Sequence, residues 1–173
     1  MRTYEAKAFT FDELSDEAKE KAKQRHAEAC GYSWDAEAMD SLRKFAQAFD
    51  AKLTDWQVDW FAGSPSHADF DAPEMSHAEI ARRLLNLGEY SSETLRGAGD
   101  CKLTGYCADE DALDGFRKAF FSGEKDLCEL LQEGFQSWLT AAQADCEHQY
   151  GDEGFSELSG ANDWEFDEAG DRL

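Results

Sequence analysis

Residues 124–148 read EKDLCELLQEGFQSWLTAAQADCEH, and this stretch carries the longest helical pattern in the chain. Its apolar residues recur at helical spacing, which places them on one side of a helix. They are Leu127, Leu131, Trp138, Ala142 and Cys146, with Leu130 and Phe135 beside them. The pattern therefore predicts a long amphipathic helix with one buried side.

Shorter helical patterns precede this stretch. We expect helices over residues 15–30, 33–49, 76–87 and 109–121. Thr10 with Glu13 and Ser76 with Glu79 match the capping box, in which each residue of the pair satisfies a backbone N–H near the other. Gly31 is placed to end the first helix, because glycine adopts the backbone conformation that follows a helix.

The strand patterns are fewer and shorter. Residues 53–62, LTDWQVDWFA, place Trp56, Val58 and Trp60 two residues apart, which is typical of a strand. Weaker strand patterns occur at residues 1–11, 101–108 and 162–167, whereas residues 63–73 are expected to form a turn-rich loop. We therefore predict an α+β fold, a single acidic domain over residues 1–173 in which a small, mostly antiparallel sheet packs with about five helices.

The charge is the most unusual property of the chain. It has 38 acidic and 17 basic side chains, which give a formal net charge of −21. This balance excludes direct binding to nucleic acid or to an anionic membrane, because both need a surface rich in Lys and Arg. Residues 108–173 alone carry eighteen acidic and four basic side chains. The skew favours an acidic surface for a basic protein partner, with a solvated face that binds nothing as the alternative.

The candidate partner-binding residues are acids of this C-terminal third. Helical neighbours lie roughly 5–6 Å apart, so rows of carboxylates can present regularly spaced negative charge, as a nucleic-acid backbone does. A folded surface of this kind can occupy a Lys/Arg cleft built for nucleic acid. The predicted set is Asp109, Glu110, Asp111, Asp126, Glu129, Glu133, Asp145, Glu147, Asp152, Glu153, Glu157, Asp163, Glu165, Asp167 and Glu168.

The sequence contains no recognisable catalytic or cofactor-binding motif. His67 and His77 flank a loop with several acids, but their spacing matches no metal-ligand pattern, and surface histidines are the simpler interpretation. The five cysteines are expected to be reduced thiols. No apolar run approaches the roughly 20 residues of a membrane-spanning helix. We therefore predict a protein without catalytic residues, metal or cofactor that does not act as an enzyme.

Three stretches carry a resemblance to a known family. They are FDELSDEAKEKA at Phe11–Ala22, TGYCADEDALD at Thr104–Asp114 and ANDWEFDEAG at Ala161–Gly170. These resemble recurrent segments of a family of small acidic phage and prophage proteins of mostly unassigned function. The loop after the aromatic strand departs from that family, because Ala62–His67 stands where a glycine- and glutamine-rich stretch is expected.

The resemblance implies a phage-encoded protein in the cytoplasm of a bacterial host. Small acidic proteins of that origin are similar to anti-CRISPR and antirestriction inhibitors, which cover the basic surface of a nucleic-acid-binding complex. The function expected on this basis is inhibition of a CRISPR effector by an acidic, DNA-mimicking face. The alternatives are a phage regulatory or toxin-neutralising protein that binds a specific basic protein and, less favoured, a metal-assisted enzyme that uses His67 and His77.

Overall fold

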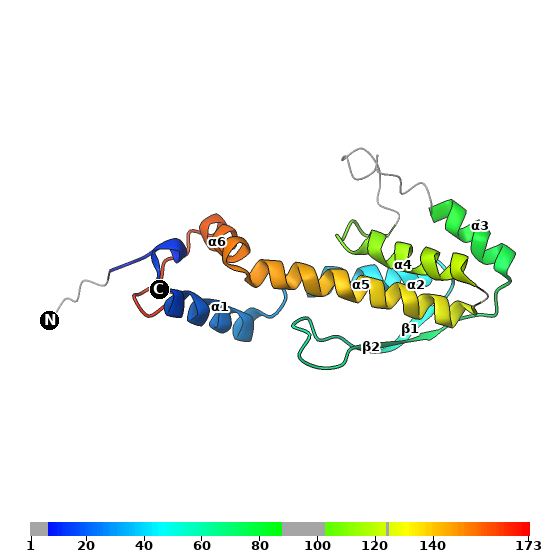
Figure 1. Ribbon diagram of the computed structural model, residues 1–173, viewed down its shortest axis with the longest axis horizontal. Coiled ribbons are helices and arrows are strands. Elements are labelled where there is room, and N and C mark those ends of the chain that lie inside the picture. The colour runs from blue at the N-terminus through cyan, green and yellow to red at the C-terminus, as the bar shows by residue number, and fades with distance from the viewer. Residues whose placement is uncertain (1–6, 88–102, 124) are drawn as a thin grey trace. The chain divides into compact units, whose positions relative to one another are not determined.

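The computed structural model describes residues 7–87, 103–123 and 125–173 (Figure 1). Its elements are the 3-10 helix η1 (Phe11–Glu13), α1 (Asp16–Cys30), α2 (Asp35–Gln47), β1 (Lys52–Gln57), β2 (His67–Asp71), α3 (His77–Leu87), α4 (Asp109–Ser122), α5 (Leu127–Tyr150) and α6 (Asp152–Ala161). Within these residues, six α-helices accompany one two-stranded antiparallel sheet. The predicted α+β class is confirmed.

The chain forms two compact units. Unit 1 consists of Met1–Ser33 together with Asp145–Leu173, and unit 2 is the continuous segment Trp34–Ala144. Unit 1 is therefore built from two segments far apart in the sequence. The predicted single domain contains two apolar cores, one in each unit.

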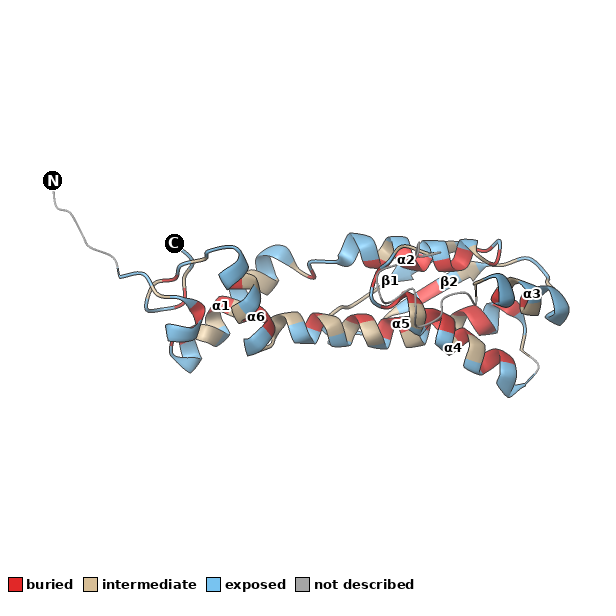
Figure 2. Cartoon of the chain, turned by 90° about the horizontal axis from the view of Figure 1, so that it is seen from above, coloured by how far each residue is buried: buried red, intermediate tan, exposed pale blue. Residues whose placement is uncertain are grey.

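The core of unit 2 is built mainly from α2, α4 and the larger part of α5. Figure 2 shows buried residues alternating with exposed ones along α5, as the sequence pattern predicts. Phe49 of the α2–β1 connection and Phe116 of α4 stack with ring centroids 4.3 Å apart, and Phe45 meets both rings edge-on. Gly134 of α5 allows the close approach of Phe45, because a Cβ at residue 134 would lie 2.4 Å from the Phe45 ring.

The sheet of unit 2 differs from the prediction in its second strand. β1 (Lys52–Gln57) covers the first half of the stretch predicted as a strand, residues 53–62, and the prediction is wrong for residues 58–62. β1 pairs with β2, which lies in a segment predicted as a loop. Side chains of α5 bind the outer edge of β2, where Gln132 Nε2 donates to the Ala68 carbonyl. A register shift between Leu53 and Asp55 interrupts the pairing of β1.

One of the weaker strand predictions, residues 101–108, is wrong for the described residues, and the other two are met only by isolated bridges. Residues 103–108 form turns that lead into α4, because backbone N–H groups of Thr104 and Gly105 turn toward the Asp109 carboxylate. Near the start of the chain Phe9 forms a single bridge with Phe166, and Phe166 forms another with Arg172. Residues 1–6, 101 and 102 lie outside the described part of the chain.

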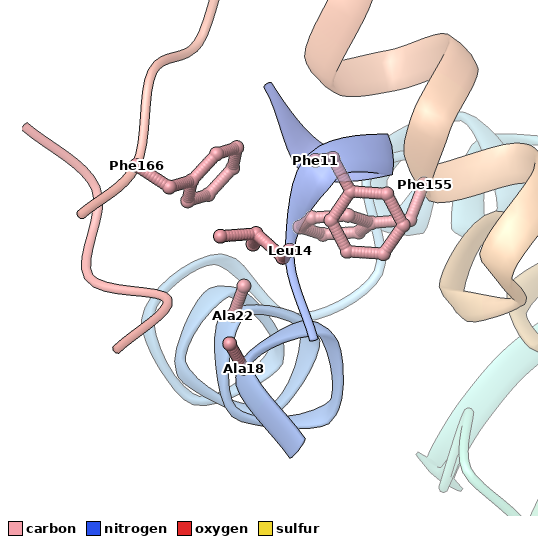
Figure 3. Close-up of a cluster of buried hydrophobic side chains, with 6 residues drawn as sticks. All are labelled: Phe11, Leu14, Ala18, Ala22, Phe155 and Phe166. Carbon is pink, nitrogen blue, oxygen red and sulfur yellow. The ribbon is translucent and has the colours of Figure 1, made fainter. Parts of the chain in front are cut away.

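The core of unit 1 joins η1 and α1 to α6 and to the C-terminal segment, residues 162–173. Its buried members are Phe11, Leu14, Ala18, Ala22, Phe155 and Phe166 (Figure 3). The rings of Phe11 and Phe155 lie 4.9 Å apart between centroids. The predicted capping box fixes η1, since the Thr10 backbone N–H donates to Glu13 Oε2 over 2.8 Å. Helix α6, which follows Gly151, was not predicted from the sequence.

Candidate protein-binding surface

The predicted binding acids fall on both units, and one of them is buried. Asp109, at the start of α4, is only 2% exposed. Its carboxylate accepts hydrogen bonds from the Thr104 and Gly105 backbone N–H groups, at 2.9 and 2.8 Å, and from the Ser41 hydroxyl. Assigning Asp109 to the partner-binding set was therefore wrong, because its carboxylate is used inside the protein.

Most of the other predicted acids of unit 2 have local structural roles. Asp126 and Glu129 form a reciprocal capping box at the start of α5, with two backbone-to-carboxylate hydrogen bonds of 2.9 Å. Glu133 forms an ion pair with Lys125. Glu110 and Asp111 lie in the first turn of α4, where negative charge is favourable at the positive end of the helix dipole. Partial burial, and then the charge of Asp114, raise the pKa of Asp111.

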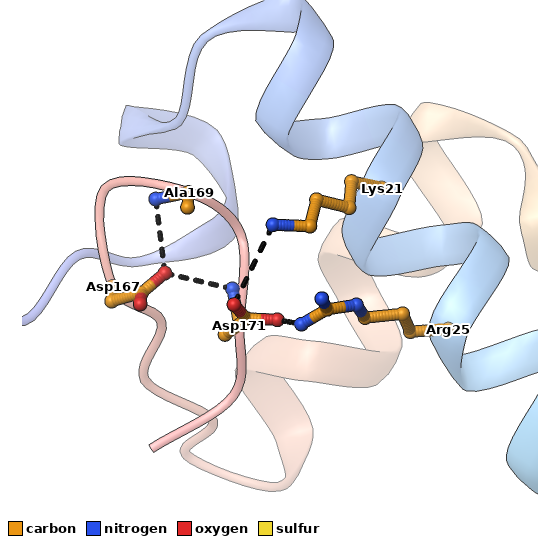
Figure 4. A network of polar contacts seen from close by, with 5 residues as sticks. All are labelled: Lys21, Arg25, Asp167, Ala169 and Asp171. Carbon is orange, nitrogen blue, oxygen red and sulfur yellow. Dashed lines mark hydrogen bonds and ion pairs between the residues drawn. The ribbon is translucent and has the colours of Figure 1, made fainter.

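Three predicted acids of unit 1 also have partners within the protein. Asp145 accepts hydrogen bonds from the Tyr32 hydroxyl and from Gln149. Asp152 lies 2.6 Å from Lys23 Nζ, and that hydrogen bond and charge lower the pKa of Asp152. Asp167 accepts from the backbone N–H groups of Ala169 and Asp171, and so closes a turn of the C-terminal segment (Figure 4).

Helix α1 neutralises part of the C-terminal acidic charge, which sequence skew alone does not reveal. Lys21 and Arg25 both form ion pairs with Asp171 (Figure 4). Burial opposes the charge of Lys23, but its hydrogen bonds to Asp152 and Glu20 prevail and raise the pKa of Lys23. Two acids of the C-terminal segment of unit 1, Asp152 and Asp171, are therefore paired with bases of α1.

The remaining predicted acids of unit 1 are exposed. None of these six forms an ion pair or a side-chain hydrogen bond with another residue that the structure describes. They are Glu147, Glu153, Glu157, Asp163, Glu165 and Glu168. Because nothing within the described protein neutralises them, these carboxylates are available to a partner.

Two of these six line a hollow of about 380 Å³, which we call the acidic hollow. Its carboxylates are Asp12, Asp163 and Glu165, and no Lys or Arg is among its lining residues. Phe11 and Trp164 supply aromatic walls, and serines and a glycine of α6 complete it. Asp12, which the sequence reasoning missed, reaches the hollow from η1 and accepts a 2.8 Å hydrogen bond from Ser156 of α6.

Asp163 has a left-handed backbone, with φ of 52°. Asp and Asn adopt this conformation more readily than most other residues. It follows Asn162, the C-cap of α6, and leads the chain into Trp164 and Glu165, and all three residues line the acidic hollow.

The histidines of the metal-assisted alternative lie on different elements. His67 Nε2, at the start of β2, is 3.6 Å from Asp55 Oδ2. The His77 ring, at the start of α3, stacks on Phe120 with centroids 4.0 Å apart. Across residues 7–87, 103–123 and 125–173, no group of three or more His, Cys, Asp or Glu side chains is arranged to hold a metal ion.

None of the helices in the described part of the chain has the length and apolar character needed to cross a bilayer. Comparisons with protein-family models, with curated proteins and with solved structures found no match to this chain.

Proposed function

We propose that this protein inhibits a host defence system of the anti-CRISPR type by binding the basic, nucleic-acid-binding surface of an effector complex. The acidic hollow is the main support for the binding part of this proposal. It combines three carboxylates with two aromatic walls, and no Lys or Arg is among its lining residues, although Lys19 and Arg172 lie beside the Phe11 and Trp164 rings.

The chemistry of the hollow suits a Lys or Arg side chain of the partner. Carboxylates form charge-assisted hydrogen bonds with guanidinium and ammonium groups, and an aromatic face attracts the same cations. Trp164 lies between Asp163 and Glu165 in the sequence, so both kinds of contact come from one short segment. Trp is among the residue types enriched in the few positions that supply most of the binding energy of a protein interface, whereas scattered charge mainly accelerates association.

The net charge of −21 supports the electrostatic part of the mechanism. A strongly negative protein is steered toward a positive cleft, and its association rate falls as salt screens the charges. The connection to host defence rests on the family resemblance of Phe11–Ala22, Thr104–Asp114 and Ala161–Gly170, and the identity of the partner follows from that resemblance.

The test compares two doubly neutralised variants that carry the same change in charge. One is Asp163→Asn with Glu165→Gln in the acidic hollow. The control is Asp69→Asn with Asp71→Asn on β2, where both residues are exposed. Each tagged protein is used to capture partners from a lysate with active CRISPR and restriction systems, and affinity for the captured complex is then measured.

We expect the hollow variant to bind about tenfold more weakly, which corresponds to roughly 1.4 kcal/mol, and the β2 control to bind nearly as well as the wild type. Equal losses in both variants would mean that only net charge matters, and the hollow would not be the site. Target DNA should displace the protein. A partner held with equal affinity in the presence of DNA would instead support the regulatory or toxin-neutralising alternative.

A further inference from the structure

A second hollow of unit 1 has a different chemistry from the acidic one. It measures about 390 Å³ and lies among α1, α6 and the C-terminal segment, and we call it the His26 hollow. Trp164 lines both hollows. The size falls within the range of roughly 300–1,000 Å³ that is usual for small-molecule sites.

The walls of the His26 hollow are largely aromatic. The His26 ring lies 4.9 Å from the Trp164 ring and 5.5 Å from the Phe155 ring, measured between centroids. Phe155 and Phe166 are buried in the core, whereas His26 and Trp164 are half-buried and border the hollow. A planar ring entering this space can therefore meet both His26 and Trp164 in offset or edge-to-face contact.

The charge around the His26 hollow is opposite in sign to the net charge of unit 1. The unit carries seventeen acidic and seven basic side chains. Yet the residues that line the hollow include Arg25 and Arg172 and only one carboxylate, Asp171. That carboxylate is already paired with Arg25 and Lys21. The border of the hollow therefore has a local excess of positive charge.

Arg172 is the cation that remains available. Its guanidinium lies 4.2 Å from the centroid of the Trp164 ring, which holds the group beside the hollow. No ion pair joins Arg172 to a carboxylate in the described part of the chain. Burial, and then the charge of Arg172, lower the pKa of His26, so its imidazole is neutral at pH 7 and acts as an uncharged ring.

We propose that the His26 hollow binds an aromatic anion, whose planar ring packs against His26 and Trp164 and whose anionic group pairs with Arg172. An aromatic carboxylate and a mononucleotide both have this chemistry. Trp164 also lines the acidic hollow, but His26 and Arg172 line only this one, so the proposal does not depend on the proposed function.

The test uses the full chain with 1-naphthalenesulfonate, an aromatic anion that stays ionised at every working pH. Calorimetry and amide chemical-shift mapping are repeated with 1-naphthalenemethanol, which lacks the charge, and with methanesulfonate, which lacks the ring. We expect measurable binding of the aromatic sulfonate only, with shifts at His26, Trp164 and Arg172. Equal binding of the neutral alcohol, or no binding of the sulfonate at millimolar concentration, would overturn the proposal.

Arg172→Gln should weaken binding of the sulfonate about tenfold, the effect of losing one charge-assisted contact. Arg117→Gln in unit 2 is the matched control, because it removes the same charge and leaves the affinity unchanged. Asp163→Asn with Glu165→Gln should also keep the affinity, which separates this site from the acidic hollow. Unaltered binding by Arg172→Gln would contradict the assignment.

Two further probes distinguish the natural sources of such a ligand. Adenosine monophosphate represents mononucleotides, and indole-3-acetate represents aromatic carboxylates. The one that binds more tightly and depends on Arg172 identifies the class. If neither binds in an Arg172-dependent way, the proposal fails for both sources.

Discussion

At the scale of single residues, Gly170 shows how closely the C-terminal segment approaches α1. It has φ of 82°, and a Cβ at this position would lie 2.2 Å from the Ala18 carbonyl oxygen. Gly170→Ala should therefore destabilise unit 1 by about 3 kcal/mol or more, because both the backbone conformation and the contact oppose the methyl group. Urea denaturation followed by amide spectra of unit 1 measures the loss.

The matched control for Gly170 is Gly31, which also has positive φ, 63°, but would place its Cβ in open space. Gly31→Ala should have only the conformational effect, about 1–3 kcal/mol, because φ of 63° with ψ of −150° lies in a region that essentially only glycine adopts. Equal losses at the two positions would show that the approach to Ala18 is not tight.

The titration of His26 makes the stability of unit 1 depend on pH. Burial, and then Arg172, lower the pKa of His26 from its ordinary value of 6.5, so the unfolded chain binds a proton more readily than the folded one. The contribution of His26 to stability is therefore fully present above about pH 6.5 and is lost as the pH falls from 7.5 towards 5.5. Denaturation midpoints across this range measure the effect. In His26→Gln this decrease should be smaller, and an identical decrease would assign it to other groups.

At the scale of elements, Asp126 at the start of α5 shows whether a predicted binding acid caps a helix or contacts a partner. Asp126 belongs to the predicted binding set but caps α5 through the backbone N–H of Glu129. Asp126→Ala should lower stability by about 1 kcal/mol and leave partner affinity unchanged. Thermal unfolding and the capture assay measure the two effects. If the variant kept its stability but bound the partner more weakly, Asp126 would belong to the binding surface after all.

The elements that were predicted well from the sequence have either a long apolar stripe or a pair of capping residues close together in the sequence. The apolar stripe of α5 spans many turns, and the Ser76–Glu79 box is formed with hydrogen bonds of 3.0 and 3.3 Å at the start of α3. The missed elements depend on distant partners. β2 is short and is held by β1 and by Gln132 of α5, and α6 has a single buried aromatic residue, Phe155.

The candidate site was predictable in composition but not in arrangement. Exposed acids such as Glu153 and Glu165 were correctly placed on the surface. Asp109 was wrongly placed on the surface. In the sequence, a carboxylate at a helix start that faces solvent cannot be told from one that accepts hydrogen bonds from buried N–H groups. Asp12 was missed because its place in the acidic hollow depends on a contact with α6, far along the chain.

At the scale of the whole molecule, the excess of acids in the C-terminal third of the sequence does not become an excess of negative charge in one of the two units. Unit 1 has seventeen acidic and seven basic side chains, and unit 2 has twenty-one and ten. The two units therefore have nearly equal net charge, since the first 33 residues bring bases to the acids of the last 29. Each unit is self-repelling at neutral pH, and its few ion pairs are largely exposed and individually weak.

This balance predicts that salt stabilises the protein at neutral pH. Screening weakens the repulsion among an excess of 21 negative charges more than it weakens the exposed ion pairs. Raising NaCl from about 20 to 300 mM at pH 7 should therefore increase Tm by a few degrees, equivalent to about 1 kcal/mol. KCl should have the same effect, because general screening does not distinguish the two cations. Near the isoelectric point of about 4.3 the increase should vanish. A Tm that falls with salt at pH 7 would mean that the ion pairs of α1 with Asp152 and Asp171 outweigh the repulsion, and that the acidic charge is held within the protein instead of being presented to a partner.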